Sequence, residues 1–268
     1  MSSAAPISWA GLPLGPGVRI LTCDENGLCA LDKPAGVLSI PNGPKDQERT
    51  LVRASYREAG EYFEWDGGRL WLLNRLDSAT SGVILAAANP EVAEIVRERF
   101  KRREVEKTYQ ALVFGRPSGR QEVWRDRIGV SRKGGRLRTG EGNVPAESEM
   151  KLVRTWAQSG GLPHLALIQL RPHTGRSHQL RVQCARRRLP IVGDQTYGDF
   201  PMNRMFAKAT GVKRLMLHSL GTEVTYPLAG REFHFRAEAP LPPEFSVDKE
   251  SGLDPDGGSG APTLRPSH

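Results

Sequence analysis

The chain has 268 residues, a net charge of +8 and a pI of about 9.7. Hydrophobic residues make up 38% of it and charged residues 25%, which is the composition of a globular protein with enough length to bury a core. No apolar run approaches the roughly 20 residues that cross a bilayer, and no secretory signal opens the chain, so we expect a cytoplasmic protein without a membrane partner. The positive charge favours a polyanionic partner, although a basic pI alone is a weak signal.

The cysteines are few and do not form a recognisable framework. The chain has three of them, Cys23, Cys29 and Cys184. An odd, sparse set does not indicate a disulfide scaffold, and the spacing of the first two is not that of a zinc knuckle. We therefore expect reduced, structural thiols and no metal site.

Composition divides the chain into three parts. Residues 1–18 are rich in proline and glycine and are predicted to be an irregular leader. Residues 249–268 contain proline, glycine and serine with almost nothing apolar, which predicts a disordered tail. Residues 19–248 hold no obvious linker or repeat, so we expect a single domain there.

The first predicted elements are strands at 28–31, 70–73 and 83–88, followed by a helix. Asn89 is a suitable helix cap and Pro90 suits the first helical position. The apolar residues of that helix recur at helical spacing, at Val92, Ile95, Val96 and Phe100. Its basic end, residues 97–103, is either a solvated face or an RNA contact.

Strands outnumber helices in the rest of the chain. We expect strands at 107–115, 164–170, 213–219, 221–227 and 231–238, with the first of these half-buried, and a short helix at 177–187. Because strands and helices do not alternate strictly, the pattern predicts an α+β fold with a largely antiparallel, mixed sheet and flanking helices.

Three segments carry candidate chemistry. "NRLDSATSG" places Asp77 between two buried strands, where functional residues are often displayed. Tyr109 lies in the strand at 107–115, and Arg181 lies on the short helix three residues after His178. A lone aspartate can attack a sugar's anomeric carbon, but no second carboxylate is evident beside it. Each residue also has a plain structural interpretation, as a turn cap, a packed strand residue or an exposed helix arginine.

Several enzyme classes are not indicated. The chain has no nucleophile elbow, phosphate-binding loop or dinucleotide fingerprint. A metal-dependent nuclease would need clustered carboxylates, whereas Asp77, Asp194 and Asp199 lie in separate segments. The spacing of His173 and His178 does not suit two metal ligands on one helix face.

Several motifs together resemble one family. "NRLDSATSGVILAA", "EKTYQALVFG" and "HTGRSHQLRV…LPIVGDQTYG" are similar to the motifs of the RluA branch of pseudouridine synthases, and "LDKPAGVLSIP" and "RLMLHSLGTEVTYPLAGREFHFRAEAP" match its opening and closing segments. The resemblance covers roughly residues 19–245 in the right order. It implies a mixed sheet with a central RNA-binding cleft, a monomer, no metal or organic cofactor, and conversion of uridine in ribosomal or transfer RNA to pseudouridine.

The resemblance also implies roles for individual residues. Asp77 would be the catalytic aspartate, Tyr109 the ring that packs on the target base, and Arg181 the partner of the aspartate. Arg75 would enter the RNA stack when the uridine is flipped out, which costs a few kcal/mol. A nearby arginine favours the charged form of a carboxylate, as a nucleophile or base requires. We expect further RNA contacts from Asn74, Lys107, Thr174, Arg176 and His178.

The chain departs from the family pattern at several positions. Asn74 and Gln183 stand where histidine is common in relatives, and arginines at 186–188 replace a more apolar approach to Pro190. About 18 residues precede the predicted domain, so we expect no additional small RNA-binding domain before it. The departures prevent transfer of an RNA target from any one relative. A non-catalytic RNA-binding or remodelling protein on the same scaffold remains the alternative.

Overall fold

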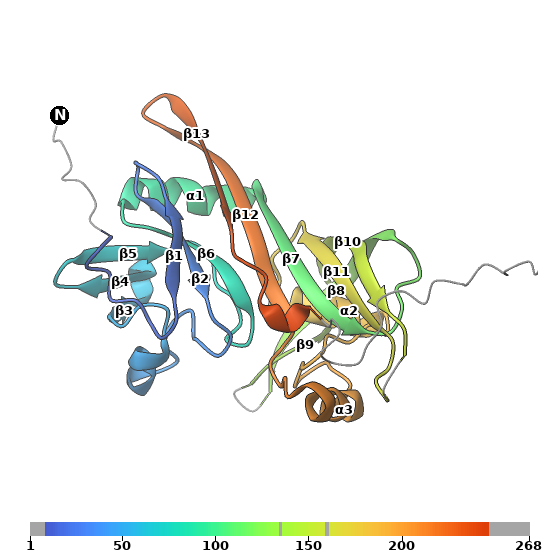
Figure 1. The fold of residues 1–268 in the computed structure, drawn as a ribbon. Coiled ribbons are helices and arrows are strands. Elements are labelled where there is room, and N and C mark those ends of the chain that lie inside the picture. Colours follow the sequence, from blue (N-terminus) through green and yellow to red (C-terminus); the bar gives the residue numbers. More distant parts are fainter. Residues whose placement is uncertain (1–8, 134–135, 159–160, 247–268) are drawn as a thin grey trace, which may run out of the picture.

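The computed structural model describes residues 9–133, 136–158 and 161–246. In this part of the chain, three α-helices accompany thirteen strands (Figure 1). The strands are β1 (Arg19–Cys23), β2 (Leu28–Lys33), β3 (Ser55–Arg57), β4 (Tyr62–Trp65), β5 (Gly68–Leu72), β6 (Ser81–Ala87), β7 (Val105–Phe114), β8 (Gln121–Lys133), β9 (Arg136–Glu141), β10 (Val144–Trp156), β11 (Leu165–Pro172), β12 (Leu217–Leu228) and β13 (Arg231–Glu238). The helices are α1 (Pro90–Arg102), α2 (Gln179–Arg186) and α3 (Phe200–Thr210), and short 3-10 turns cover Pro44–Arg49, Glu58–Gly60 and Pro243–Phe245.

All of these strands belong to one mixed sheet. Its main path runs β3-β4-β5-β6-β12-β7-β11-β10-β8-β9, with β2 pairing β6, β1 pairing β2, and β13 pairing β12. The pair β6–β12 is parallel, and the other named pairs are antiparallel. The predicted α+β fold with a largely antiparallel, mixed sheet is therefore confirmed.

The parallel junction of β6 and β12 is made possible by a glycine. Gly82 has φ +106, a backbone conformation that residues with a Cβ rarely adopt. A Cβ added there would lie 2.1 Å from the backbone oxygen of Ser219 on β12. The two strands can thus approach closely at the point where His218 pairs with Ser81 and Ser219 pairs with Gly82.

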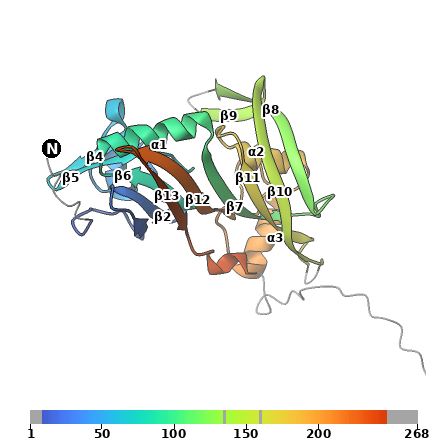
Figure 2. The ribbon, with the colours of Figure 1, turned by 90° about the horizontal axis from the view of Figure 1, so that it is seen from above.

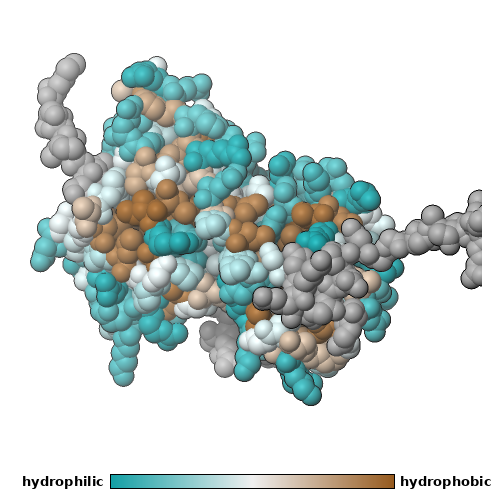
Figure 3. Space-filling view, in the orientation of Figure 1, coloured by the Kyte–Doolittle hydropathy of each residue, from teal (hydrophilic) through white to brown (hydrophobic). Residues whose placement is uncertain are grey.

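The core consists of apolar side chains on both faces of the sheet. Each of the seven residues of β6 is buried, because this strand lies in the interior of the sheet with packing on both sides. On one side, α1 contributes its buried residues Val92, Ala93 and Val96 to a cluster with β6 and β12. Figure 3 shows hydrophobic residues gathered across the middle of one face of the molecule, with hydrophilic residues toward its ends.

Most predicted elements are confirmed, including the helix that begins at Pro90. Asn89 caps α1 by accepting a hydrogen bond from the Glu91 N–H at 2.9 Å. Part of the basic end of α1 is paired locally, because Arg99 pairs with Glu104 at 2.6 Å and Arg102 pairs with Glu98 at 3.0 Å. This pairing favours the solvated interpretation of that end over an RNA contact.

Two predictions about strands were wrong. The segments at 213–219 and 221–227 were expected to be separate, but residues 217–228 form the single strand β12. A shift of its register with β7 between Ser219 and Gly221 explains why the pattern looked interrupted. The strand at 107–115 was expected to be half-buried, yet the last four residues of β7 are buried on both faces because β11 and β12 flank it.

The ends of the chain are described only in part. Within the predicted leader, Trp9, Leu12 and Val18 pack onto the core that contains β2 and β6. The predicted disordered tail, residues 249–268, lies outside the described residues. Among the described helices, none is long and apolar enough to cross a membrane.

Candidate active site

Asp77 lies in the connection between β5 and β6, as predicted, and this connection is held firmly. The N–H of Thr80 donates to the Asp77 carbonyl at 3.0 Å, which closes a turn. One residue before Asp77, both backbone groups of Leu76 bond the Ser39 hydroxyl, at 3.1 Å for N–H and 2.7 Å for C=O. The Asp77 side chain is 31% exposed, so a fixed backbone presents a carboxylate that substrate can reach.

Arg181 is placed between two carboxylates. Its Nη1 donates to Asp77 Oδ2 at 3.0 Å, while Nε and Nη2 donate to the two oxygens of Asp194 at 2.8 and 2.7 Å. The side chain is 8% exposed, and its guanidinium lies 5.2 Å from the centre of the Tyr197 ring. Burial alone would lower the pKa of Arg181, but the hydrogen bonds and negative charges of Asp194 and Asp77 raise it. Arg181 is thus a fixed cation facing Asp77.

Asp194 provides the rigid side of this arrangement. Its side chain is 1% exposed. Its Oδ1 also accepts the backbone N–H groups of Thr196 and Tyr197, at 2.8 and 3.0 Å. Burial would raise the pKa of Asp194, but the bond to Arg181 and these N–H groups lower it, so the carboxylate is ionised at neutral pH. A bidentate pair of this kind fixes the plane of the guanidinium.

His178 also lies against the aspartate. It precedes α2, and its backbone has φ 54, in the left-handed region. Its Nε2 is 3.6 Å from Asp77 Oδ2, and its Nδ1 shares a 2.9 Å hydrogen bond with the Tyr197 hydroxyl. Burial lowers the pKa of His178, against the opposing effect of Asp77. The sequence predicted an RNA contact here, whereas these contacts are with other residues of the site.

Tyr109 is half-buried on β7 and packs against two parts of the hydrophobic core. Burial raises the pKa of its hydroxyl to about 12, the negative charge of Asp77 acts in the same direction, and a hydrogen bond to Ser219 opposes it. The hydroxyl is therefore protonated at neutral pH. The structure brings Tyr109, Asp77 and Arg181 together, although they lie far apart in the sequence.

Lys33 was not among the predicted site residues. Its ammonium group is buried and donates to the carbonyls of Pro34 at 3.0 Å, Val37 at 2.7 Å and Ser78 at 3.0 Å. Burial lowers the pKa of Lys33 to about 7, while the negative charge of Asp77 favours its protonated form. Because Ser78 follows Asp77 directly, Lys33 ties the loop that carries Asp77 to the end of β2.

A second polar cluster supports the start of β6. The Ser81 hydroxyl shares a 2.8 Å hydrogen bond with Nδ1 of His218 and accepts one from Arg214. Burial lowers the pKa of His218 to about 4, so this imidazole is neutral at pH 7. The cluster therefore joins β6 to β12 behind Asp77.

Three residues predicted to contact RNA, Asn74, Arg75 and Lys107, differ in exposure and in hydrogen bonding. Arg75 is exposed and lies two residues before the aspartate. The side-chain oxygen of Asn74 accepts the Leu85 N–H at 2.8 Å, so it holds the loop against β6. Lys107 is half-buried on β7, and burial lowers its pKa.

The predicted contacts before α2 are engaged within the protein. Thr174 is 4% exposed, and its hydroxyl accepts the Glu147 N–H at 3.0 Å and donates to Gln179 at 2.7 Å. The hydroxyl thus supports the loop before α2, and the RNA contact of Thr174 stays a prediction. Arg176 is partly exposed and donates to the Pro145 carbonyl at 3.3 Å.

Gln183, one of the departures from the family pattern, anchors α2. It is completely buried, accepts the Ser148 hydroxyl at 2.7 Å and donates to Asp126 at 2.9 Å and to the Trp124 carbonyl at 3.2 Å. An amide can donate and accept at once, which matches these partners. This network fixes the helix that carries Arg181.

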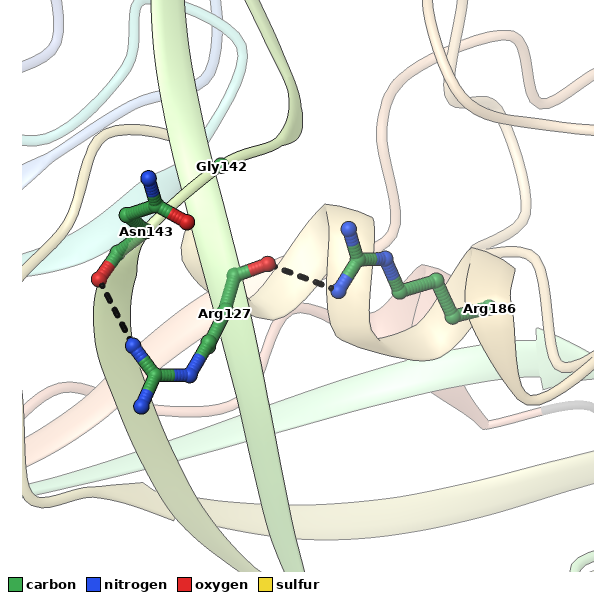
Figure 4. Close-up of a pocket in the computed structure, with 4 residues that line it drawn as sticks. All are labelled: Arg127, Gly142, Asn143 and Arg186. Carbon is green, nitrogen blue, oxygen red and sulfur yellow. Dashed lines mark hydrogen bonds between the residues drawn. The ribbon is translucent and has the colours of Figure 1, made fainter.

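A surface cavity of about 720 Å³ lies at the far end of α2. Figure 4 shows its lining by Arg127, Gly142, Asn143 and Arg186. Arg186 donates to the Arg127 carbonyl at 3.1 Å, and Arg127 donates to the Asn143 carbonyl at 3.3 Å. The cavity does not include Asp77, and the predicted central RNA-binding cleft stays a prediction.

Sequence reasoning missed three members of the site. Asp194 and Tyr197 lie within the quoted "GDQTYG" motif, and Lys33 lies within "LDKPAG". A charged residue inside a run of buried strand residues is a signal that could have identified Lys33, because an unpaired buried charge is costly. Among the described residues, no group of three or more His, Cys, Asp or Glu side chains could hold a metal ion.

Comparison with known proteins agrees with this geometry. Residues 27–186 match the family model described as RNA pseudouridylate synthase. The chain is 30% identical to tRNA pseudouridine synthase C of Yersinia pestis over 223 residues, which is 80% of this chain and 83% of that protein. It is 32% identical to the dual-specificity RNA pseudouridine synthase RluA of Escherichia coli K12 over 238 residues, which is 85% of this chain and 95% of that protein.

The fold is also shared with a solved structure. Human RNA pseudouridylate synthase domain containing 1 superposes with a TM-score of 0.65 and 23% sequence identity, covering 91% of this chain and 92% of that one. At this identity the likeness establishes the fold. The match of the family model over more than half of the chain, together with the two bacterial relatives, establishes the family. The chain therefore belongs to the RNA pseudouridylate synthase family and is an RNA pseudouridine synthase.

Proposed function

We propose that this synthase modifies uridines in transfer or ribosomal RNA, with Asp77 as its catalytic aspartate. The observation that carries the proposal is the 3.0 Å contact between Asp77 and an Arg181 side chain that Asp194 holds on its other edge. The relative from Yersinia pestis is named a tRNA synthase, and the Escherichia coli relative is named dual-specific for RNA. Both names support a structured RNA as substrate.

The reaction exchanges one bond between base and ribose for another. The bond from N1 of uracil to C1′ of the ribose breaks, the base turns, and C5 bonds to C1′. C5 then loses its hydrogen as a proton, and N1 takes up a proton. Asp77 serves this sequence either by attack on C1′ or by removal of a sugar proton, and both routes need a carboxylate close to the ribose. Its 31% exposed side chain, backed by Arg181, suits that position.

Tyr109 provides the surface for the flipped base. With a hydroxyl pKa of about 12, it is a neutral ring at pH 7 and packs on uracil without adding charge. Such stacking contributes about 1–3 kcal/mol per base. Arg75 is exposed two residues before Asp77 and fills the gap in the RNA stack that the flipped uridine leaves.

The test is tritium release from uridine-5-tritiated RNA taken from cells that lack this protein, with transfer and ribosomal RNA assayed separately. Formation of the C5–C1′ bond must expel that tritium. Wild type should release it from at least one fraction, and Asp77→Asn should lower the rate by about three orders of magnitude or more. Release by both proteins at equal rates would remove Asp77 from the mechanism. Binding without release by either would favour a non-catalytic RNA-binding protein.

A further inference from the structure

The surface of α3 has an unusual charge distribution. From residue 200 to residue 222 the sequence contains no aspartate or glutamate, while it contains Arg204, Lys208, Lys213 and Arg214. Arg204, Lys208 and Lys213 are exposed, and none of them forms an ion pair with another described residue. Three cations at the end of α1 differ, because Arg99 pairs with Glu104 and both Lys101 and Arg102 pair with Glu98. Arg204, Lys208 and Lys213 therefore have no carboxylate partner among the described residues, unlike Arg99, Lys101 and Arg102.

Apolar side chains are exposed on the same helix. Phe200 is 47% exposed and Met205 is 46% exposed, whereas Asn203 and Phe206 face the protein interior. Arg204, Met205 and Lys208 are three, four and seven positions after Pro201, which places them on one face of a helix. The outward face of α3 therefore combines cations with an aromatic ring and a thioether.

α3 is joined to the active site by hydrogen bonds. Asn203 donates from Nδ2 to the Asp194 carbonyl at 3.0 Å and accepts the Gly193 N–H at 2.7 Å. Asp194 in turn holds Arg181, which contacts Asp77. A molecule bound on α3 would therefore be held at a fixed position relative to Asp77.

The topology places α3 at the same end of the sheet as Asp77. The chain passes from Asp77 into Ser81 at the start of β6, and from α3 into His218 near the start of β12. Ser81 and His218 are register partners in the parallel pair β6–β12. The segment from Asp77 and the segment from α3 therefore enter the sheet at the same end of these two strands. Figures 1 and 2 show α1 on the opposite side of the molecule from α3.

We propose that the outward face of α3, made by Phe200, Arg204, Met205 and Lys208 and continued by Lys213, binds the RNA strand that flanks the target uridine. The cations contact phosphates, and the Phe200 ring and Met205 pack on an unstacked base and its sugar. This inference rests on the proposed function, since it assumes an RNA substrate at Asp77. Single-stranded RNA is recognised by this combination of positive charge and aromatic surface.

The charge component is tested by two matched double variants. Arg204→Gln with Lys208→Gln removes two positive charges from α3, and Lys101→Gln with Arg102→Gln removes two from α1. Binding of fluorescently labelled bulk tRNA and of labelled ribosomal RNA is measured by anisotropy from 50 to 300 mM KCl. The α3 variant should raise Kd about tenfold near 150 mM and reduce the slope of log K against log salt by about 1.4, at about 0.7 per lost phosphate contact. The α1 variant should leave Kd within about twofold of wild type.

The apolar component is tested with Phe200→Leu. Loss of a stacked base should raise Kd about fivefold or more, while the salt slope stays at the wild-type value. Thermal melts of all variants should match wild type, because these side chains lie outside the core. An α3 variant that binds like wild type, or α1 and α3 variants that weaken binding equally, would overturn the proposal, as would an unchanged Kd for Phe200→Leu.

Tritium release separates this inference from the proposed function. In the RNA fraction that wild type modifies, the α3 variant should raise KM about tenfold and keep kcat within about twofold. Absence of release by wild type would contradict the proposed function, while the anisotropy measurements would still decide whether α3 binds RNA. A fall in kcat at unchanged KM would contradict RNA binding by α3.

Discussion

The Arg181 side chain contacts a buried carboxylate, Asp194, and an accessible one, Asp77. Its bond to Asp194 fixes the orientation of the guanidinium toward Asp77. Replacing Asp194 with asparagine removes one charge from a pair that is almost fully buried. We expect a loss of about 3 kcal/mol in the free energy of unfolding, measured with urea, because the guanidinium loses its buried counter-charge. The rate of tritium release should fall at least tenfold.

Asp199→Asn is the matched control for that variant. Asp199 caps α3 by accepting the Met202 N–H at 2.9 Å, and asparagine is an equally good cap. Its stability and activity should stay near wild type. Equal behaviour of the two variants would mean that Arg181 does not depend on Asp194.

The variant His178→Asn distinguishes two roles for this histidine. It either contacts RNA or orients Asp77. Asparagine tolerates the left-handed backbone at this position, so His178→Asn should fold. Because the ring lies 3.6 Å from Asp77 and is fixed by Tyr197, we expect kcat for tritium release to fall about tenfold with little change in KM. A raised KM at normal kcat would instead support the RNA contact that the sequence suggested.

The junction of β6 and β12 positions the elements on which the site depends. Gly82→Ala would place a methyl group 2.1 Å from a backbone oxygen and impose positive φ on alanine. We expect a loss of about 2–5 kcal/mol in the free energy of unfolding, measured with urea.

Gly230→Ala shows how much of that loss is backbone strain. Gly230 lies in the turn between β12 and β13 with φ +76, and nothing lies within 4 Å of an added Cβ. Its replacement should cost only about 1–2 kcal/mol. Equal losses at the two positions would show that the close approach of the strands is not the cause.

The stability of the whole molecule should depend on pH through His218. In the unfolded chain this imidazole takes up a proton as the pH falls below about 6.5, whereas burial lowers its pKa in the folded protein to about 4. Between these values the unfolded state binds more protons, so the free energy of unfolding should fall as pH falls from 6.5 to 4, by on the order of 3 kcal/mol. His178, whose pKa is also lowered, acts in the same direction.

Urea unfolding at pH 7, 5.5 and 4 measures this dependence. The control is His218→Gln, which retains a hydrogen-bonding side chain without a titrating group. Its stability should fall less across the same interval, and the difference from wild type is the histidine contribution. Parallel curves for the two proteins would show that His218 does not cause the loss.

The elements of this fold that could be predicted are those whose signals lie within one short stretch of sequence. The α1 helix could be placed because its cap, its first proline and its apolar period all agree. β12 was divided in error because a register shift near Gly221 is a relation between two strands, which the pattern of one strand does not contain. The side-by-side parallel pairing of β6 and β12 likewise depends on segments that are distant in the chain.

Asp77, Tyr109 and Arg181 could be nominated from sequence because their motifs carry distinctive neighbours in a fixed order. The amino-acid order alone also determined the basic character of the molecule, the family and the α+β class. Only the tertiary structure decided that Arg181 is shared with Asp194 and that Lys33 ties down the loop that carries Asp77. It also decided that Arg99, Lys101 and Arg102 of α1 pair with glutamates, whereas Arg204 and Lys208 of α3 have no carboxylate partner among the described residues. The physical reason is that burial and charge pairing depend on which distant segments meet in space, and the linear sequence does not specify those distances locally.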